Sequence, residues 1–139
     1  MKVLLDTNVI VDVALERQPF FADSRQVLLL VEQEQVEGYI SASTFSDIYY
    51  LVRRGRGREW AKEFVIWLVT FCRIATVDRV AVLMALNANF KDFEDAIQHS
   101  TAVLNQLEAI VTRDTADFPV STPRIITPAQ LIQELTNSP

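Results

Sequence analysis

The sequence contains one cysteine, one histidine and three glycines among its 139 residues. The single Cys72 cannot form a disulfide within the chain, and no Cys or His spacing fits a zinc site. The single His99 excludes a mechanism that uses two histidines as general acid and base. Half of the residues are hydrophobic and proline is scarce, which excludes disordered, collagen-like and low-complexity sequence.

Long hydrophobic runs are also missing. The largely apolar stretch 64–71 falls far short of the roughly 20 residues that a membrane span requires. Asp6 and Asp12 interrupt the apolar N-terminal stretch, which a signal peptide would keep uniformly apolar. We therefore expect a cytoplasmic protein without a membrane segment, in which Asp12 is a surface or helix-capping residue.

Basic residues are in the minority. Lys and Arg total 13 against 18 Asp and Glu, and the net charge of −5 disfavours a broad, nonspecific nucleic-acid binder. Four arginines nevertheless fall within six positions: Arg53, Arg54, Arg56 and Arg58. Such a cluster can contact phosphates. It can equally be an exposed, mobile loop that pairs with acidic neighbours, or a contact for a partner protein.

Short β-type runs alternate with longer helical ones, which is typical of a parallel sheet covered by helices. We expect one domain, residues 1–139, of α/β class. The expected strands are residues 2–5, a strand that starts at Tyr39 and Ile40, 73–77, 109–112, and a short edge strand at 125–126. The expected helices are 23–37, 47–54, 59–71, 79–88, 92–107 and 127–135. Gly38 is expected to end the first of them, and Gly55 and Gly57 the second. The expected N-caps are Ser43 or Thr44 for helix 47–54 and Asp78 for helix 79–88. The polar triplet 6–8 is interpreted as a loop.

Acidic residues follow several of these strands. Asp6 comes directly after the first strand, Asp47 lies at the start of the helix after the second, and Asp114 and Asp117 follow strand 109–112. A fourth contribution comes from Asp92 and Asp95, which share a face at the start of a helix. Because ligands of open α/β sheets bind beyond the carboxyl ends of the strands, we expect these side chains to meet.

Electrostatic repulsion destabilises the folded protein when a cluster of carboxylates of this kind has no bound cation. Four carboxylates about 7 Å apart, at an effective dielectric constant near 20, repel by roughly 14 kcal/mol in total. That energy is comparable with the whole stability of a domain, about 5–15 kcal/mol. Hard oxygen ligands without His or Cys select Mg²⁺ or Mn²⁺ rather than zinc. A site for Mg²⁺ or Mn²⁺ is therefore the economical explanation.

These motifs together resemble the PIN-domain family. The resemblance rests on residues 4–8 (LLDTN), Asp47, residues 92–96 (DFEDA), and residues 111–114 (VTRD) followed by Asp117 and Phe118. It implies a three-layer α/β/α fold with a mostly parallel sheet and metal-dependent endoribonuclease activity. It also implies frequent membership of VapC-type toxin–antitoxin pairs, with an RNA substrate, an antitoxin partner and a homodimer. The apolar helix around Trp67 is a candidate dimer surface.

The resemblance also implies roles for individual residues. Asp6 would be the first metal ligand, Asp95 the central one and Asp117 a further ligand or a water-positioning group, with Asp92 and Asp114 as additional candidates. Asp47 stands where the family usually has Glu, one methylene longer, and joins Asp6, Asp95 and Asp117 as a catalytic candidate. The substrate-side candidates are Thr7, Asn8, Thr112, Arg53, Arg54, Arg56 and Arg58.

Two alternatives remain open at this point. The shorter Asp47 also suits a degenerate domain that has kept the fold and binds protein or RNA without cleaving it. A metal-dependent aspartyl phosphatase would need a second Asp two residues after Asp6, where this chain has Asn8. The phosphatase is therefore the weaker alternative.

Overall fold

The centre of the molecule is a five-stranded sheet in which every neighbouring pair of strands is parallel. The computed structural model describes residues 1–137. The strand order is β3-β2-β1-β4-β5. The strands are β1 (Lys2–Leu5), β2 (Glu37–Ser41), β3 (Arg73–Ala75), β4 (Ala109–Val111) and β5 (Arg124–Ile126).

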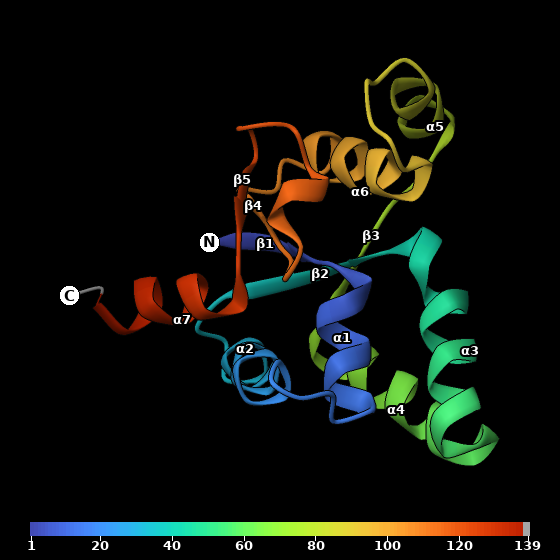
Figure 1. Ribbon diagram of the computed structural model, residues 1–139, viewed down its shortest axis with the longest axis vertical. Helices are drawn as coiled ribbons and strands as arrows, with labels where there is room; N and C mark the ends of the chain where they lie inside the picture. The colour runs from blue at the N-terminus through green and yellow to red at the C-terminus, as the bar shows by residue number, and fades with distance from the viewer. Residues whose placement is uncertain (138–139) are drawn as a thin grey trace.

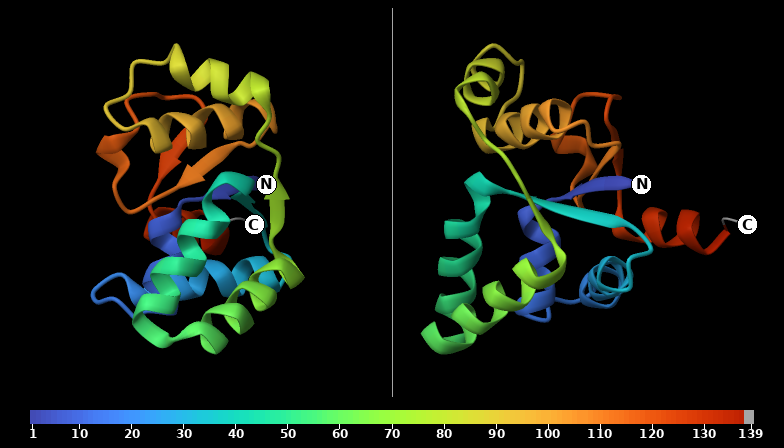
Figure 2. Two further views of the ribbon diagram at one scale, coloured as in Figure 1. Left: turned by 90° about the vertical axis from the view of Figure 1, so that its right-hand side faces the viewer. Right: turned by 180° about the vertical axis from the view of Figure 1, so that it is seen from behind.

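Helices cover both faces of the sheet (Figure 1). One face carries α1 (Thr7–Ala14), α2 (Phe21–Glu32), α3 (Phe45–Arg56), α4 (Arg58–Phe71) and α7 (Pro128–Asn137). The other carries α5 (Arg79–Leu86) and α6 (Phe93–Leu104), as the turned views in Figure 2 also show. Two short 3₁₀ turns, η1 (Ala42–Thr44) and η2 (Thr115–Asp117), follow β2 and β4. The expected three-layer α/β/α fold is confirmed. No helix within residues 1–137 is long and apolar enough to cross a membrane.

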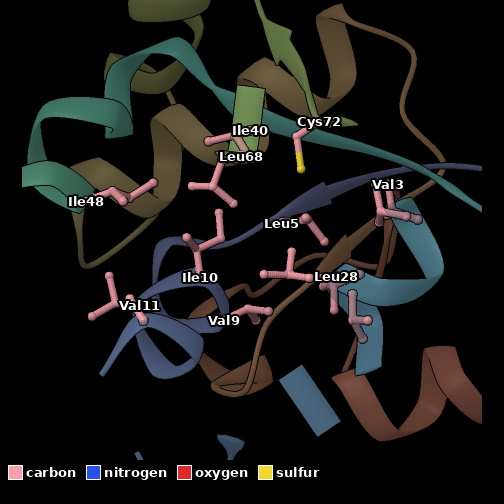
Figure 3. Close-up of a cluster of buried hydrophobic side chains, with 14 of the residues drawn as sticks. Val3, Leu5, Val9, Ile10, Val11, Leu28, Ile40, Ile48, Leu68 and Cys72 are labelled. Carbon is pink, nitrogen blue, oxygen red and sulfur yellow. The ribbon is translucent and has the colours of Figure 1, made fainter. Parts of the chain in front are cut away.

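Alternation along the strands divides the core into two parts. Val3 and Leu5 of β1 point into the larger cluster, where Ile10, Leu28 and Leu68 of three helices meet them (Figure 3). The intervening Leu4 belongs to a smaller cluster with Ile110 and Ala102 on the α6 face. Full burial of a Leu or Ile side chain contributes about 1.5–3 kcal/mol, so this central strand anchors both layers.

The strand order changes direction beside β1. The chain passes from β1 through α1 and α2 to β2 on one side, whereas β4 pairs with β1 on the other side. The backbone N–H of Asp6 donates to the carbonyl of Val111 at 2.9 Å, which keeps the ends of β1 and β4 together. Such a switch point opens a crevice at the carboxyl ends of the strands, where ligands bind.

The expectation of a loop at residues 6–8 was wrong. Helix α1 begins at Thr7, directly after β1, and Asp6 is its N-cap, with Oδ1 accepting from the Thr7 N–H at 2.7 Å. Val9, Ile10 and Val11 are all buried, so three consecutive positions of this short helix pack into the core. An eight-residue helix is marginal by itself, so tertiary packing supplies most of its stability. Asp6 and Asn8 are thereby fixed on a rigid element.

Two glycines that were expected to end helices serve close packing instead. Helix α2 ends at Glu32, and Gly38 lies inside β2, where a Cβ would come within 2.8 Å of Val31. Gly55 lies inside α3, where a Cβ would come within 2.6 Å of Leu15. Only Gly57, with φ of 90°, ends α3 as expected. The arginine stretch is therefore helical rather than a mobile loop.

The expected helix caps are confirmed in one case and changed in another. Asp78 caps α5 by accepting from the Ala81 N–H at 3.1 Å, as expected. Ahead of α3 the side chain that accepts a backbone N–H is that of Ser41, which caps η1, while Thr44 occupies the N-cap position of α3 without such a bond. Helix α6 ends at Leu104, three residues earlier than expected.

Candidate active site

Carboxylates from four parts of the chain line one pocket of about 440 Å³ at the carboxyl end of β1. Five of the six aspartates expected at the site lie there, and Asp114 is the exception. The lining residues are Asp6, Thr7, Asn8, Val11, Arg17, Asp47, Tyr50, Leu51, Arg54, Asp92, Glu94, Asp95 and Asp117. The topology thus brings together residues that are more than a hundred positions apart in the sequence.

Asp6 is the most tightly held of these carboxylates. It is 7% exposed, and its Oδ1 accepts from the Thr7 N–H at 2.7 Å and from Gln98 Nε2 at 2.8 Å. Its Oδ2 accepts from Thr112 Oγ1 at 2.8 Å. Burial raises the pKa of Asp6, whereas these three donors lower it. The hydrogen bonds fix the orientation of both oxygens.

Asp95 lies in the first turn of α6 and faces the greatest accumulation of negative charge. Loss of water contact, followed by the charges of Asp6, Asp92 and Asp117, raises the pKa of Asp95 to about 7. Asp92 is the N-cap of the same helix and accepts from the Asp95 N–H at 3.1 Å. A carboxyl group that titrates near neutral pH exchanges its proton readily for a cation.

Glu94, Gln98 and Arg17 are among the residues of this site that were not predicted from the sequence. Glu94 lines the pocket, and burial followed by the charges of Asp47, Asp92 and Asp6 raises the pKa of its carboxyl group. The sequence could have indicated Glu94, because it lies between Asp92 and Asp95, which were both predicted site residues. Fully buried Gln98 follows Asp95 by three residues and therefore shares its helix face.

Asp114 lies beside the pocket lining rather than in it. Its Oδ2 accepts from Asn8 Nδ2 at 3.1 Å and lies 3.7 Å from Arg113 Nε. Its backbone N–H donates to Thr112 Oγ1 at 3.1 Å. In this arrangement Asp114 connects Asn8 with Thr112 and orients both. The structure thus favours a positioning role for Asp114 over direct cation binding.

The four clustered arginines separate into different environments. Arg54 lines the acidic pocket. Arg56 donates to the carbonyl of Ala14 at 3.1 Å, and its guanidinium lies 3.8 Å from the centre of the Trp60 ring. Arg53 and Arg58 are exposed and do not line the pocket. The structure therefore brings only one of these four side chains to the candidate site.

The expectation that Asp12 is a surface or capping residue was wrong. Its side chain is fully buried within α1. Oδ2 lies 3.3 Å from Arg113 and Oδ1 lies 3.7 Å from Arg17. A buried carboxylate needs such partners, because an unpaired charge is costly away from water. Asp12 thus holds two arginines, of which Arg17 lines the acidic pocket.

The donor set suits a hard divalent cation, although no ready-made site is assembled. Within residues 1–137, no three His, Cys, Asp or Glu side chains stand close enough to hold a metal ion. The pocket offers carboxylate, amide and hydroxyl oxygens without His or Cys, which are the ligands of Mg²⁺ and Mn²⁺. Burial, followed by the negative charges of Asp6, Asp92 and Asp117, raises the pKa of Asp95, and a bound cation would offset both effects.

Comparison with known proteins agrees with this geometry. The family model described as "PIN domain" matches residues 2–116. This chain belongs to the PIN-domain family. A curated relative, "Ribonuclease VapC1" of Aquifex aeolicus (strain VF5), is 28% identical over 122 residues, which cover 84% of each chain.

Solved structures share the fold of this PIN domain. A toxin–antitoxin complex from Klebsiella pneumoniae matches with a TM-score of 0.69 and 23% identity, covering 91% of this chain and 97% of the other. VapBC2 from Rickettsia felis, bound to a DNA fragment from its promoter, matches with a TM-score of 0.65 and 14% identity over 91% and 97% of the chains. Mycobacterium tuberculosis VapC20, named as a Sarcin-Ricin loop cleaving toxin, matches with a TM-score of 0.62 and 14% identity over 78% and 86%.

Proposed function

We propose that this PIN domain is a Mg²⁺- or Mn²⁺-dependent endoribonuclease and the toxin of a toxin–antitoxin pair. The relative in Aquifex aeolicus is named a ribonuclease, and two of the structural neighbours are toxin–antitoxin complexes. The observation that carries the proposal is the convergence of Asp6, Asp47, Glu94, Asp95 and Asp117 on one pocket at the switch point of the sheet.

The acidity of the pocket is itself an argument for a cation. An RNA phosphodiester is anionic, so a pocket lined by carboxylates repels it unless positive charge is bound there. Asp6, Asp95 and Asp117 would hold the cation, and Asp47 and Glu94 would approach it from α3 and the start of α6. A bound divalent cation supplies activation of water and neutralises charge that develops at phosphorus.

The residues of the chain perform the positioning. Thr112, Gln98 and the Thr7 N–H hold both oxygens of Asp6, so that carboxylate cannot turn away from the pocket. The pKa of Asp95 is raised to about 7, so its carboxylate becomes available to a cation only around neutral pH. Glu94 supplies the longer acidic side chain in a pocket where position 47 has the shorter Asp. Cleavage would therefore be favoured as the pH rises through 7.

Partner proteins are part of the same proposal. We propose an antitoxin that binds this chain, as the assemblies of the structural neighbours suggest. The homodimer stays a prediction. Trp67 packs partly buried against the core, whereas Val80 and Leu86 of α5 are 55% and 63% exposed. Exposed apolar residues of this kind mark association surfaces, and sedimentation of the purified chain measures the oligomeric state.

Two substitutions test the proposed chemistry. We expect Asp6→Asn and Asp95→Asn each to reduce Mg²⁺-dependent cleavage of RNA by at least about a hundredfold, because loss of a ligand charge weakens cation binding and transition-state stabilisation. Asp23→Asn, an exposed aspartate on α2, is the matched control and should cleave normally. Circular dichroism should show the same fold for all variants.

The outcomes separate the proposal from its alternative. Full cleavage by both Asp6→Asn and Asp95→Asn contradicts the assignment of the site. If the wild-type chain neither cleaves RNA nor gains thermal stability with Mg²⁺, the domain is a binding module that has lost the chemistry.

A further inference from the structure

One face of α3 continues the acidic pocket away from the carboxylates. Asp47, Tyr50, Leu51 and Arg54 line the pocket at spacings of three, four and seven residues, so they share a single face of the helix. Helix α1 packs against α3 and contributes Asn8 and Val11 to the same lining. The pocket is thus a groove that begins at carboxylates and ends at Arg54.

The length of this groove exceeds one nucleotide. Seven helical residues separate Asp47 from Arg54, which corresponds to about 10 Å along the axis of α3. In B-DNA, for comparison, successive phosphates of one strand are spaced by about 3.4 Å along the helix axis. When one phosphodiester lies at the carboxylates, Arg54 therefore meets a different phosphate of the same strand.

A second positive charge is held at the groove by a buried partner. Arg17 lines the pocket, and its side chain is 41% exposed. Its guanidinium lies 3.7 Å from Oδ1 of Asp12, a fully buried carboxylate whose other oxygen lies 3.3 Å from Arg113. Asp12 therefore restrains Arg17 while leaving donors of its guanidinium free to bind a phosphate.

Tyr50 adds an exposed aromatic surface between the carboxylates and the arginine. Tyr50 is 58% exposed, although it lines a polar pocket, and its ring packs edge-on against Tyr49 with 5.1 Å between centroids. Aromatic rings beside cationic groups bind single-stranded nucleic acid by stacking on bases. A base in a duplex is stacked and paired, so its face is not available to such a ring.

We propose that Tyr50, Arg54 and Arg17 form a subsite for single-stranded RNA next to the bond to be cleaved. Tyr50 stacks on a nucleobase, and the two arginines bind a neighbouring phosphate. The subsite rests on the proposed ribonuclease function, but it concerns binding of the strand and not the cleavage step. It also explains how a chain of net charge −5 binds a polyanion, because positive charge is concentrated where the strand leaves the carboxylates.

Binding of RNA without cleavage tests the subsite. The probe is a fluorescein-labelled single-stranded oligoribonucleotide in Mg²⁺, titrated with chains that all carry Asp6→Asn, and fluorescence anisotropy gives Kd. We expect Arg54→Ala and Tyr50→Ala each to raise Kd by roughly tenfold. Tyr50→Phe keeps the stacking ring and should bind nearly as well as its parent. Arg17→Lys keeps a charge beside Asp12 and should weaken binding less than Arg54→Ala.

The controls share the chemistry of the tested substitutions. Arg53→Ala and Arg58→Ala remove the same charge from exposed positions outside the pocket and should leave Kd within about twofold. Loss of a phosphate contact at Arg54 should also reduce the slope of log Kd against log salt by about 0.7. The same label on a perfectly paired RNA duplex should bind more weakly, and Tyr50→Ala should change its Kd little.

The results distinguish this inference from the proposed function. If Tyr50→Ala and Arg54→Ala bind RNA as Arg53→Ala does, the subsite is wrong, whatever the wild-type chain cleaves. Equal weakening by Arg53→Ala and Arg54→Ala also contradicts it, because total charge rather than the groove then governs binding. The cleavage assay on the wild-type chain separately decides whether the domain is a ribonuclease.

Discussion

Three hydrogen-bond donors converge on Asp6, and each comes from a different part of the chain. The Thr7 N–H begins α1, Gln98 lies on α6, and Thr112 follows β4. Because Thr112 Oγ1 also accepts from the Asp114 N–H, it connects the carboxylate with the turn that follows β4. Side chains that orient a metal ligand influence metal affinity almost as strongly as the ligand itself.

Replacement of Thr112 by Val tests this orientation. The substitution keeps the shape of the side chain but removes the donor to Asp6, so we expect the pKa of Asp6 to rise further and Mg²⁺ affinity to fall about 10–100-fold. Calorimetric titration with Mg²⁺ measures the change. Thr101→Val is the matched control, because Thr101 is equally buried and its hydroxyl has no hydrogen-bond partner among residues 1–137. Equal Mg²⁺ affinity in both variants would contradict the role of Thr112.

Residue types alone could identify most of the acidic site but not its details. Carboxylates after strands predicted Asp6, Asp47 and Asp117, because the carboxyl ends of parallel strands meet at one edge. Asp95 was predicted separately, as one of two aspartates on the same face at the start of a helix. The sequence could not show that the Asp114 carboxylate contacts Asn8 and Arg113 beside the pocket and does not line it. That outcome depends on side-chain contacts between segments far apart in the chain.

At the scale of elements, the contact between α2 and β2 depends on the absence of a side chain at Gly38. A Cβ at this position would lie 2.8 and 2.9 Å from the two methyl groups of Val31 and 3.3 Å from Leu5. Val31 is β-branched, with little rotamer freedom in a helix, and Leu5 is fully buried in the central strand. Neither side chain can move aside without disturbing the core.

We therefore expect Gly38→Ala to lower the free energy of unfolding by about 1–3 kcal/mol through overpacking. Urea denaturation followed by circular dichroism measures it. In the double variant Gly38→Ala/Val31→Ala the contact is removed, so the loss should be smaller than the sum of the two single losses. Strict additivity would mean that Val31 and the new methyl group do not meet.

Sequence periodicity could predict the helices that have one buried and one exposed face. It could not predict a helix in which several consecutive residues are buried. The alternation of buried and exposed positions is clear in α4 and α6, and both were expected close to their observed bounds. Helix α1 presents Val9, Ile10 and Val11 to the core, so its sequence resembles a strand as much as a helix. An Asp N-cap and a turn-forming Asp have the same local signature, and packing decides between them.

For the whole molecule, the carboxylate pocket links stability to pH and to cations. The pKa of Asp95 is raised from 3.8 to about 7, and the pKa values of Asp6 and Glu94 are raised in the same direction, chiefly by burial. Between about pH 4 and 7 the folded chain therefore binds more protons than the unfolded chain. The contribution of these protons to stability is complete at low pH and is lost as the pH rises through 7.

This linkage predicts that a rise in pH destabilises the cation-free protein and increases the stabilisation that a cation provides. In EDTA the melting temperature should fall between pH 5.5 and 7.5, apart from the smaller changes of groups elsewhere, because repulsion among the ionised carboxylates grows. Saturating Mg²⁺ should raise the melting temperature more at pH 7.5 than at pH 5.5, since the cation then meets carboxylates that no longer hold protons. Asp95→Asn cannot ionise at this position, so its melting temperature in EDTA should exceed that of the wild type at pH 7.5 and depend less on pH. Calorimetric melts of both chains at the two pH values measure these shifts, and identical pH profiles for them would show that Asp95 is not the group that couples folding to the cation.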